Sequence, residues 1–289
     1  MELLREPGAK VIIALPVCGL FVNLHSIAKG LFLIFMRIIT YNVNGIRSAV
    51  KKGFIDWLNT DPADVICLQE IKAHKEDVPV LDIEGAGYRV YSFSAQKKGY
   101  SGVAILTKIE PDFVQYGSKI EQSDFEGRVI RADFGELTVV NAYFPSGTSG
   151  DDRQTYKYQW LSEFFDYIQE LRKTRPHLVV CGDYNICHKA IDIHDPVRNK
   201  NYTGFLPEER AWMDKLFENG FVDTFRHFNQ EPHQYTWWSA FAGARANNKG
   251  WRIDYLNVTA PLAGKLKHAE IRPDVRHSDH CPVYLEINN

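Results

Sequence analysis

A histidine and two carboxylates near the C-terminus have the residue types needed for acid–base chemistry. Asp279 and His280 are neighbours within residues 278–282, and Asp254 lies in the preceding segment 250–255. A histidine titrates near neutral pH, and a carboxylate can fix its tautomer and stabilise its charged form. His280, with Asp254 as the group that orients its ring, is therefore a candidate catalytic residue. An isolated Asp-His pair is weak evidence, so the hypothesis depends on what the rest of the chain places nearby.

Polar residues of the kinds that bind metal ions and phosphate lie at the ends of several apolar runs that read as strands. These positions are Asn42, Asn44, Gln69, Glu70, Asn141, Tyr143, Asp183, Asn185, Asp254, Asp279 and His280. In open α/β sheets such strand ends meet along one rim, where ligands bind. Each position alone has an ordinary explanation, because Asn-Gly and Gly-Asp-x-Asn sequences also form turns. Turns do not easily explain so many polar residues at comparable strand ends.

The elements that would position these residues can be read from the apolar pattern. The predicted strands are 37–41, 65–68, 88–93, 103–106, 129–134, 137–143, 178–181, 255–258 and 283–287. Helices are predicted over 48–59 and 158–172, and over a segment that Pro207 opens and Gly220 closes. Some strands are joined by tight turns such as Gly135-Glu136 and others by helices. We therefore predict an α/β protein with mixed rather than purely parallel sheets.

Composition limits the possible partners. The chain has 289 residues, 45% of them hydrophobic, and a net charge of −2, so contact with a polyanion requires a local basic patch or a metal ion. No low-complexity linker or internal repeat follows residue 36, and we expect one domain there. The five cysteines are Cys18, Cys67, Cys181, Cys187 and Cys281. Their scattered positions favour reduced core thiols, and no Cys/His spacing suggests zinc.

Residues 1–35 form an apolar extension that differs from the rest. Its two apolar runs, 11–22 and 31–36, are each shorter than the ~20 residues that a membrane span needs. Three readings are open: a weak signal or anchor segment, a structural extension, and upstream sequence translated from a misassigned start. We favour the third, because Met36 directly precedes the first predicted strand. The catalytic part of the chain would then be residues 36–289.

Nine segments in order along 36–289 resemble the motifs of the exonuclease III family of apurinic/apyrimidinic (AP) endonucleases, within the wider endonuclease/exonuclease/phosphatase superfamily. The segments are 41–47, 68–72, 99–103, 126–130, 141–145, 181–185, 204–210, 250–255 and 278–282. Gln69-Glu70, Gly182-Asp183-Tyr184-Asn185 and Ser278-Asp279-His280 are typical of the superfamily. The segments 126–130, 204–210 and 250–255 indicate the AP-endonuclease branch.

The resemblance implies a fold and a reaction. The fold would be a four-layered sandwich of two mixed β-sheets packed face to face and flanked by helices, with 36–289 as the catalytic domain. The reaction would be Mg²⁺-dependent hydrolysis, with Mn²⁺ able to substitute, of the DNA phosphodiester 5′ to an abasic site. A 3′–5′ exonuclease or 3′-phosphodiesterase activity on double-stranded DNA would accompany it.

The resemblance also assigns roles to the residues at the strand ends. Glu70 would be the main metal ligand with Asn42 nearby, and Asp183, Asn185, Asp279 and His280 complete the candidate metal set. Asp183 would orient or deprotonate the attacking water, Asn185 would donate to a phosphate oxygen, and Tyr143 would donate to the phosphate or leaving group. His280 would contact the phosphate, with Asp254 behind it. The identity of the general base and the number of metals stay open.

Substrate contacts follow from the same resemblance. Candidate contacts to the DNA backbone are Arg47, Lys72, Lys97, Lys98, Tyr100 and Arg153. Trp237, Trp251 and Ile253 would form the apolar pocket for a flipped-out abasic sugar, which resists a sugar that carries a base. Trp238 reads as core, and Phe241 is a candidate wedge between base pairs. The loop 146–150 has small uncharged residues where other branches have amide or basic ones, which leaves the balance of exonuclease and endonuclease activities open.

Two other functions remain as alternatives. A phosphatase for inositol phosphates or lipid headgroups would need Glu70, Asp183, His280 and Asn185 but not Trp237 and Trp251. A non-catalytic nucleic-acid-binding relic would have lost at least one of the first three, and all are present. We expect a monomer that acts on double-stranded DNA with abasic sites or 3′ blocks, without a nucleotide cofactor or a stable membrane partner. The expected location is cytoplasmic, with nucleoid association on DNA.

Overall fold

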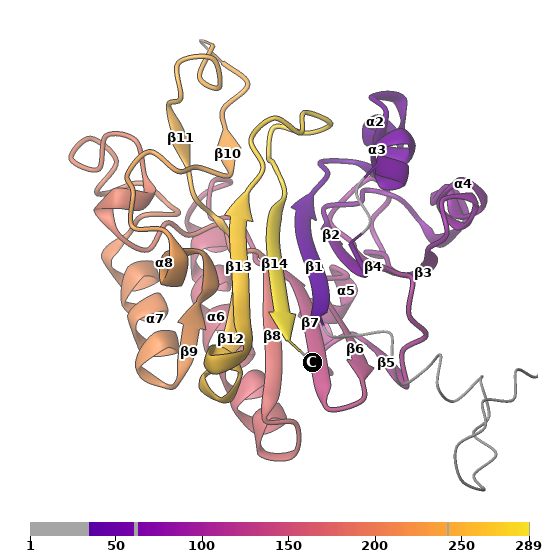
Figure 1. Ribbon diagram of the computed structural model, residues 1–289. Coiled ribbons are helices and arrows are strands. Elements are labelled where there is room, and N and C mark those ends of the chain that lie inside the picture. Colours follow the sequence, from indigo (N-terminus) through magenta and orange to yellow (C-terminus); the bar gives the residue numbers. More distant parts are fainter. Residues whose placement is uncertain (1–34, 61–62, 242, 289) are drawn as a thin grey trace, which may run out of the picture.

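The computed structural model describes residues 35–60, 63–241 and 243–288, which form two six-stranded sheets packed face to face (Figure 1). The first sheet has the order β13 (Leu266–Ile271), β14 (Val283–Asn288), β1 (Phe35–Asn42), β2 (Val65–Gln69), β4 (Val103–Thr107), β3 (Arg89–Phe93). The second has the order β5 (Phe113–Tyr116), β6 (Val129–Phe134), β7 (Leu137–Tyr143), β8 (His177–Asp183), β12 (Asp254–Thr259), β9 (Phe221–Asp223). A two-stranded ribbon pairs β10 (Trp237–Trp238) with β11 (Gly250–Trp251).

Each sheet is mixed. The pairs β1–β2 and β7–β8 are parallel, and the neighbouring pairs are antiparallel. Side chains alternate between the two faces of a strand, and here both faces are covered. In β1, Ile38 packs between the sheets and Ile39 packs against the outer helices; in β8, Cys181 and Val180 divide in the same way. Strands buried on both faces explain the continuous apolar runs in the sequence.

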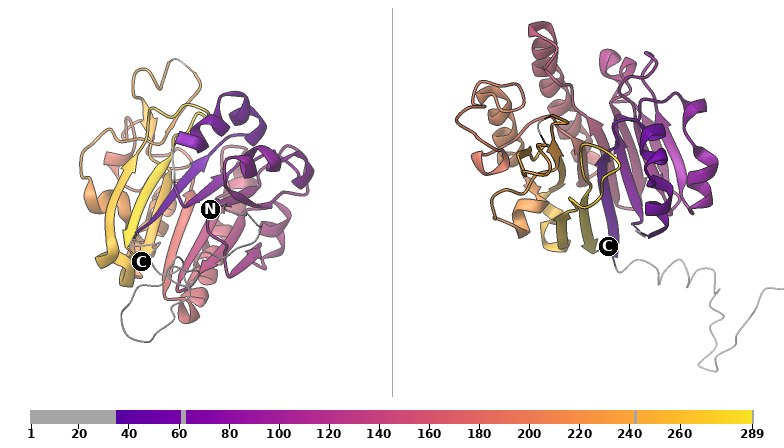
Figure 2. Two further views of the ribbon diagram at one scale, coloured as in Figure 1. Left: turned by 45° about the vertical axis from the view of Figure 1, so that its right-hand side comes forward. Right: turned by 90° about the horizontal axis from the view of Figure 1, so that it is seen from above.

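Helices cover the outer face of each sheet (Figure 2). On the first sheet lie α2 (Ile46–Lys51), α3 (Phe54–Thr60) and α4 (Val80–Gly85), and on the second lie α6 (Asp151–Thr174) and α7 (Pro207–Glu218). The shorter elements are α5 (Glu121–Phe125), α8 (Thr224–Phe228), η1 (Lys75–Asp77), η2 (Ala190–Asp192) and η3 (Ala260–Lys265). The predicted α/β class and four-layered sandwich of two mixed sheets are confirmed.

All nine predicted strands are present, with small shifts at their ends. The prediction of one helix over 48–59 is wrong, because Gly53 has a φ of +92° and separates α2 from α3. Residues 158–172 are helical, but α6 begins earlier, at Asp151. The strands β5, β9, β10, β11 and β13 were not predicted.

The chain directions bring the polar strand ends to one rim, at the top of Figure 1. The parallel strands β1 and β2 end there at Asn42 and Gln69, and β7 and β8 end at Tyr143 and Asp183. Antiparallel β12 begins there, so Asp254 pairs in register with Asp183. The predicted convergence of strand ends on one rim is therefore observed.

The N-terminal boundary lies at the opposite end of β1. This strand begins at Phe35, which pairs with Asn288, so the expected boundary before Met36 falls inside the strand. The three readings of the apolar extension concern residues 1–34, which lie outside the described residues. Among the described residues, no helix has the length and apolarity that a membrane crossing requires.

Candidate active site

Asn42 joins three strand ends at the centre of the rim. Its Nδ2 donates to Asp183 Oδ2 at 2.8 Å and to Glu70 Oε2 at 3.1 Å. Its Oδ1 accepts from the backbone N–H of Asn44 at 2.9 Å. Asn42 is buried, and one amide therefore holds a carboxylate from each sheet at a fixed separation.

His280 and Asp254 form a buried pair beside Asp183. His280 Nδ1 lies 2.9 Å from Asp254 Oδ2, and Nε2 faces Asp183 Oδ2 at 4.0 Å. Burial alone would lower the pKa of His280, but the charge and hydrogen bond of Asp254 raise that pKa to about 10. The ring is then an imidazolium at neutral pH, with Nε2–H available to an anion at the rim.

In Asp183, by contrast, the surroundings favour the uncharged form of the side chain. Burial, with the negative charge of Asp254, raises the pKa of Asp183 to about 7, against the effect of His280. A carboxyl group with a pKa near the working pH can exchange a proton during a reaction. Asp183 therefore fits the predicted role of orienting or deprotonating water.

Four residues of the site have left-handed backbone conformations: Asn44, Glu70, Lys72 and Asn185. Glu70 has a φ of 54°, which is unusual for a residue with a long side chain, whereas Asn185 has a φ of 52°, a conformation that asparagine adopts more readily. Asn185 N donates to Asp183 Oδ1 at 2.9 Å, and its Nδ2 donates to Phe144 O at 3.0 Å. Such strain persists only where surrounding contacts maintain it.

Tyr143 is the hydroxyl donor at this rim. It is paired in register with Asp183, and Arg128 donates to its carbonyl oxygen at 2.8 Å while the guanidinium lies 5.0 Å from the Tyr143 ring centroid. Burial and the negative charges of Glu70 and Asp183 raise the pKa of Tyr143 well above its usual value. The phenol therefore keeps its proton and can donate it in a hydrogen bond.

Oxygen ligands for a metal ion lie on the outer side of the cluster. Lys72 Nζ pairs with Glu70 Oε1 at 2.8 Å and donates to Asn44 Oδ1 at 2.6 Å, and Asn44 Nδ2 donates to Asp279 Oδ1 at 2.9 Å. His280 and hydrogen bonds from Asn44 and Trp237 outweigh burial and lower the pKa of Asp279. Ionised carboxylates with amide oxygens nearby are the donor set that Mg²⁺ prefers.

A second group of side chains has convergent donor atoms. Asp183, Asp254 and His280 each offer an atom within 4.8 Å of the others. His280 belongs to this group, but its Nδ1 bonds to Asp254 and a protonated Nε2 has no lone pair for a metal. Glu70 and Asp279 offer carboxylate oxygens, the ligands that a hard cation prefers, and are joined to each other through Lys72 and Asn44.

The side chains expected to form the apolar pocket cluster beside His280. Trp237 and Trp251 are partly buried and meet edge to face at 5.9 Å, and Ile253 packs in the same cluster. Trp237 Nε1 donates to Asp279 Oδ2 at 3.0 Å, and its ring lies 6.4 Å from the His280 ring. The three residues of the expected pocket are thus brought together at the catalytic cluster.

The neighbouring aromatic residues divide as expected into core and surface. Trp238 is 4% exposed and packs in the core, as predicted, whereas Phe241 is 81% exposed in the loop after β10. This exposed phenylalanine lies in the loop that joins the paired strands β10 and β11.

The candidate DNA-binding cations are arranged in two ways. Arg47, Lys97 and Lys98 are exposed and extend from α2 and the β3–β4 loop. Arg153 instead pairs with Glu126 at 2.8 Å, and its Nη2 donates to Tyr100 OH at 3.1 Å. Arg153 and Tyr100 therefore form a preorganised surface, whereas the exposed lysines are held by few neighbours.

Two residues that hold the site were missed by the sequence reasoning. Arg128 lies inside the motif segment 126–130, so the sequence did mark it as a residue of interest. Arg245 lies in no such segment. Its two terminal nitrogens donate to Ser278 O, Pro273 O and Val275 O at 2.7–2.8 Å, and its guanidinium stacks on Trp238 at 4.6 Å. Arg245 therefore fixes the loop that carries Asp279 and His280 to the ribbon that carries Trp237.

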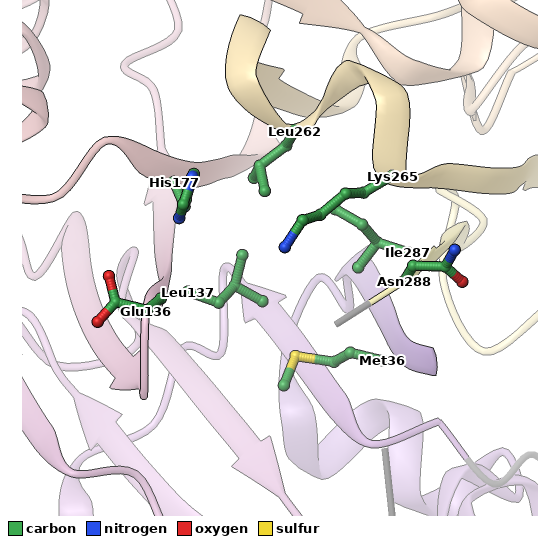
Figure 3. Close-up of a pocket in the computed structure, with 8 residues that line it drawn as sticks. All are labelled: Met36, Glu136, Leu137, His177, Leu262, Lys265, Ile287 and Asn288. Atoms are coloured by element: carbon green, nitrogen blue, oxygen red, sulfur yellow. The ribbon is translucent and has the colours of Figure 1, made fainter. Parts of the chain in front are cut away.

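Two cavities lie outside the catalytic cluster. An enclosed hollow of about 20 Å³ lies at the other end of the sandwich, where Met36, Leu137 and Ile287 meet Lys265 and His177 (Figure 3). It has room for about one water molecule. A more open cleft of about 290 Å³ runs between loop 147–151 and residues 201–206, close to Trp251 through Tyr202.

Comparison with known proteins shows the family of this chain. The Endonuclease/Exonuclease/phosphatase family matches residues 39–280. An exodeoxyribonuclease of Bacillus subtilis is 43% identical over 88% of this chain and all of its own length. The DNA repair nuclease APEX1 of Danio rerio is 40% identical over 86% of this chain and 81% of its own.

Solved structures have the same fold. An AP endonuclease from Archaeoglobus fulgidus superposes with a TM-score of 0.80 at 34% identity, covering 86% of this chain and 98% of its own. A 3′ phosphatase from Neisseria bound to a product DNA hairpin has a TM-score of 0.81 at 28% identity, covering 88% and 100%. The chain belongs to the endonuclease/exonuclease/phosphatase family, within its exonuclease III and AP-endonuclease branch.

Proposed function

We propose that this nuclease is a Mg²⁺-dependent DNA repair enzyme that hydrolyses the phosphodiester 5′ to abasic sites in double-stranded DNA. A 3′–5′ exonuclease or 3′-phosphodiesterase activity would use the same centre. The observation that carries the proposal is that Trp237, Trp251 and Ile253, the residues expected to form the apolar pocket, cluster next to Asp183, His280 and Asp254. A small-molecule phosphatase has no need of that pocket.

The side chains supply most of what phosphodiester hydrolysis requires. Mg²⁺, or Mn²⁺ in its place, held by Glu70, Asn42 and Asp279 would neutralise phosphate oxygens and the leaving group. His280, charged because of Asp254, would bind a phosphate oxygen through Nε2–H. Asp183 would take the proton of the attacking water.

Two neutral donors complete the site. Tyr143 keeps its phenolic proton and would donate to the phosphate or the leaving oxygen. Asn185 would do so through its amide, which requires one Nδ2 hydrogen to point away from Phe144 O. Donors fixed before the reaction stabilise developing charge without reorganisation at the moment of reaction.

DNA would be bound mainly by its backbone. Arg47, Lys72, Lys97, Lys98, Tyr100 and Arg153 would contact phosphates, which gives salt-dependent and sequence-independent affinity. Phe241 would enter the duplex as a wedge. The relatives named as nucleases of DNA repair, and the related 3′ phosphatase bound to a DNA hairpin, support DNA as the substrate.

The remaining expectations belong to the same proposal. We assign the activity to residues 36–289 and propose a monomer without a nucleotide cofactor. The four free cysteines among the described residues are buried, which suits a reducing cytoplasm, with nucleoid association when the enzyme is on DNA.

The test is cleavage of a duplex oligonucleotide with one tetrahydrofuran abasic analogue, by wild type and Asp183→Asn, with Mg²⁺ and with EDTA. We expect one metal-dependent cut 5′ to the analogue and a loss of at least about 10²-fold in the variant. A duplex with a 3′-phosphate, assayed in parallel, reports the second activity. An intact duplex beside rapid phosphate release from small phosphoesters would contradict the proposal and support a phosphatase.

A further inference from the structure

A fully buried ion pair lies behind the active-site rim. Lys157 on α6 and Glu209 on α7 meet with Nζ and Oε1 2.6 Å apart, and both side chains are 0% exposed. When two charges are buried, the free energy lost with their hydration is about as large as the free energy gained from their mutual attraction. An apolar pair of similar size would therefore be equally stable or more so. Glu209 also caps the start of α7 by accepting from the Leu206 N–H, but this contact gives no reason for a lysine at position 157, so the other contacts of the pair must be considered.

The lysine supports Asn185. Lys157 Nζ donates to the Asn185 carbonyl oxygen at 2.8 Å. Asn185 has the left-handed φ of 52° described above, and its side chain reaches Phe144 O. A charged donor gives a stronger hydrogen bond than a neutral one. This contact orients the Asn185 peptide, and with it the amide that we assign to the phosphate.

The glutamate supports the wall of the apolar pocket. Glu209 Oε2 accepts from the backbone N–H of Gly204 at 2.6 Å and of Leu206 at 3.0 Å. Gly204, with a φ of +92°, is wedged in the site: a Cβ there would lie 2.9 Å from the Trp251 ring and 3.1 Å from Asn185 O. The carboxylate therefore fixes the backbone segment on which Trp251 rests.

We propose that Lys157 and Glu209 are positioning residues that hold Asn185 and Trp251 in one rigid unit, so that the phosphate and the abasic sugar are aligned by a single buried contact. The inference rests on the proposed function for the roles of Asn185 and Trp251. A misplacement of about 1 Å at a reacting group can cost about 10²-fold in rate. The ion pair would therefore increase the reaction rate by holding these groups in place, which an apolar pair could not do.

The test uses a neutral double variant, Lys157→Met with Glu209→Gln. Methionine keeps the length of the lysine but donates no hydrogen bond, and glutamine keeps an oxygen for Gly204 and Leu206. No unpaired charge is left, so we expect a Tm close to wild type. On the abasic duplex we expect kcat to fall about 10- to 100-fold with little change in KM. Each single variant leaves one buried charge and should lower Tm.

A double-mutant cycle shows whether the pair acts through Asn185. The neutral double variant is combined with Asn185→Ala, and we expect the combined loss in kcat to be smaller than the product of the separate losses. The matched control is Arg131→Met with Asp133→Asn, an ion pair on β6 with side chains 13% and 9% exposed, near the far end of the sandwich. It should leave kcat unchanged, whatever its effect on Tm.

Three results would overturn the inference: a wild-type kcat in the neutral double variant, multiplicative losses in the cycle, or an equal loss in the control. If wild type cleaves neither the abasic nor the 3′-blocked duplex, the proposed function fails instead. The crystal structure of the double variant then decides the inference. A displaced Asn185 carbonyl and Trp251 ring would support it, and unchanged positions of both would overturn it.

Discussion

At the scale of single residues, the site depends on opposite treatment of neighbouring titratable groups. Asp254 raises the pKa of His280 and keeps its ring charged, whereas burial and the same Asp254 raise the pKa of Asp183 to about 7. One carboxylate therefore prepares both a cation for the phosphate and a base for the water. Groups whose pKa values are moved by their surroundings toward such tasks are typical of catalytic sites.

Asp254→Asn tests this arrangement. Burial lowers the pKa of His280 and Asp254 raises it to about 10, so without that charge the ring should lose its proton at lower pH. We expect the alkaline limb of the kcat–pH profile to move toward neutral pH and kcat at pH 8 to fall about 10²-fold. Asp279→Asn serves as the control for the pH shift, because Asp279 contributes less to the same pKa, and its shift should be smaller. An alkaline limb that stays in place in Asp254→Asn would contradict this role.

At the scale of elements, the site depends on how closely β7 and β8 approach each other. Gly182 precedes Asp183 in β8, with a φ of +143°, and a Cβ there would lie 1.8 Å from the Ala142 carbonyl oxygen of β7. Only glycine lets the two parallel strands run together to the rim. The close approach places Tyr143 in register with Asp183.

Gly182→Ala should therefore separate the strand ends. We expect a loss of unfolding free energy of about 1–3 kcal/mol, which corresponds to roughly 2–12 °C in Tm, and a loss of activity that remains below the new Tm. Thermal unfolding and abasic-site cleavage measure the two effects. Gly264→Ala is the matched control, because a Cβ there meets no atom within 4 Å. An unchanged Tm in Gly182→Ala would show that β7 and β8 can move apart freely.

The elements also show what the sequence could predict. Buried strands such as β2 and β8 are continuous apolar runs, and this pattern was sufficient to predict them from the sequence. In the edge strand β13 the neighbours Lys267 and His268 are both exposed, and the strand pairing is irregular between Leu266 and His268, so the sequence lacks the alternation of a regular strand. The break between α2 and α3 depends on the backbone of one glycine.

At the scale of the whole molecule, the two sheets are tied together directly behind the site. Gln69 Nε2 donates to Asn141 Oδ1 at 2.7 Å, and Asn141 Nδ2 donates to Leu68 O and Ala104 O across the interface. From the sequence, Asn141 looked like another polar residue of the rim. The structure buries it, because strand-end polarity does not tell a residue that faces solvent from one that faces the opposite sheet.

Contacts between distant segments explain the other omissions. Lys157 occupies the buried stripe of α6 with Leu161, Phe164 and Ile168, and a lysine on an apolar helix face was a usable signal. Its partner Glu209 could not be chosen without the packing of α6 on α7. The same holds for Arg245, whose carbonyl partners lie about 30 residues away in the chain.

Stability against acid is a property of the whole molecule. One buried aspartate that contributes to it joins three segments of the chain. Asp192 Oδ1 accepts from Arg252 Nε and Arg226 Nη2, each at 2.7 Å. Burial alone would raise the pKa of Asp192, but the two arginines lower it from 3.8 to about 2. Because the folded pKa is depressed, the contribution is complete above about pH 4 and is lost as the pH falls toward 2. It amounts to about 2 kcal/mol.

Asp192→Asn should remove this dependence and leave Arg252, which is 1% exposed, without its main counter-charge. We expect the unfolding free energy at pH 7, from urea titrations, to fall by roughly 3–5 kcal/mol, and the variant to lose less stability than wild type between pH 4 and 2. Asp214→Asn is the control, since Asp214 pairs with Lys189 with its side chain 45% exposed, and solvent-exposed pairs contribute at most about 1 kcal/mol. Equal losses in the two variants would mean that burial adds nothing to the Asp192 contacts, and the acid sensitivity of the fold would then have to come from carboxylates spread over its surface.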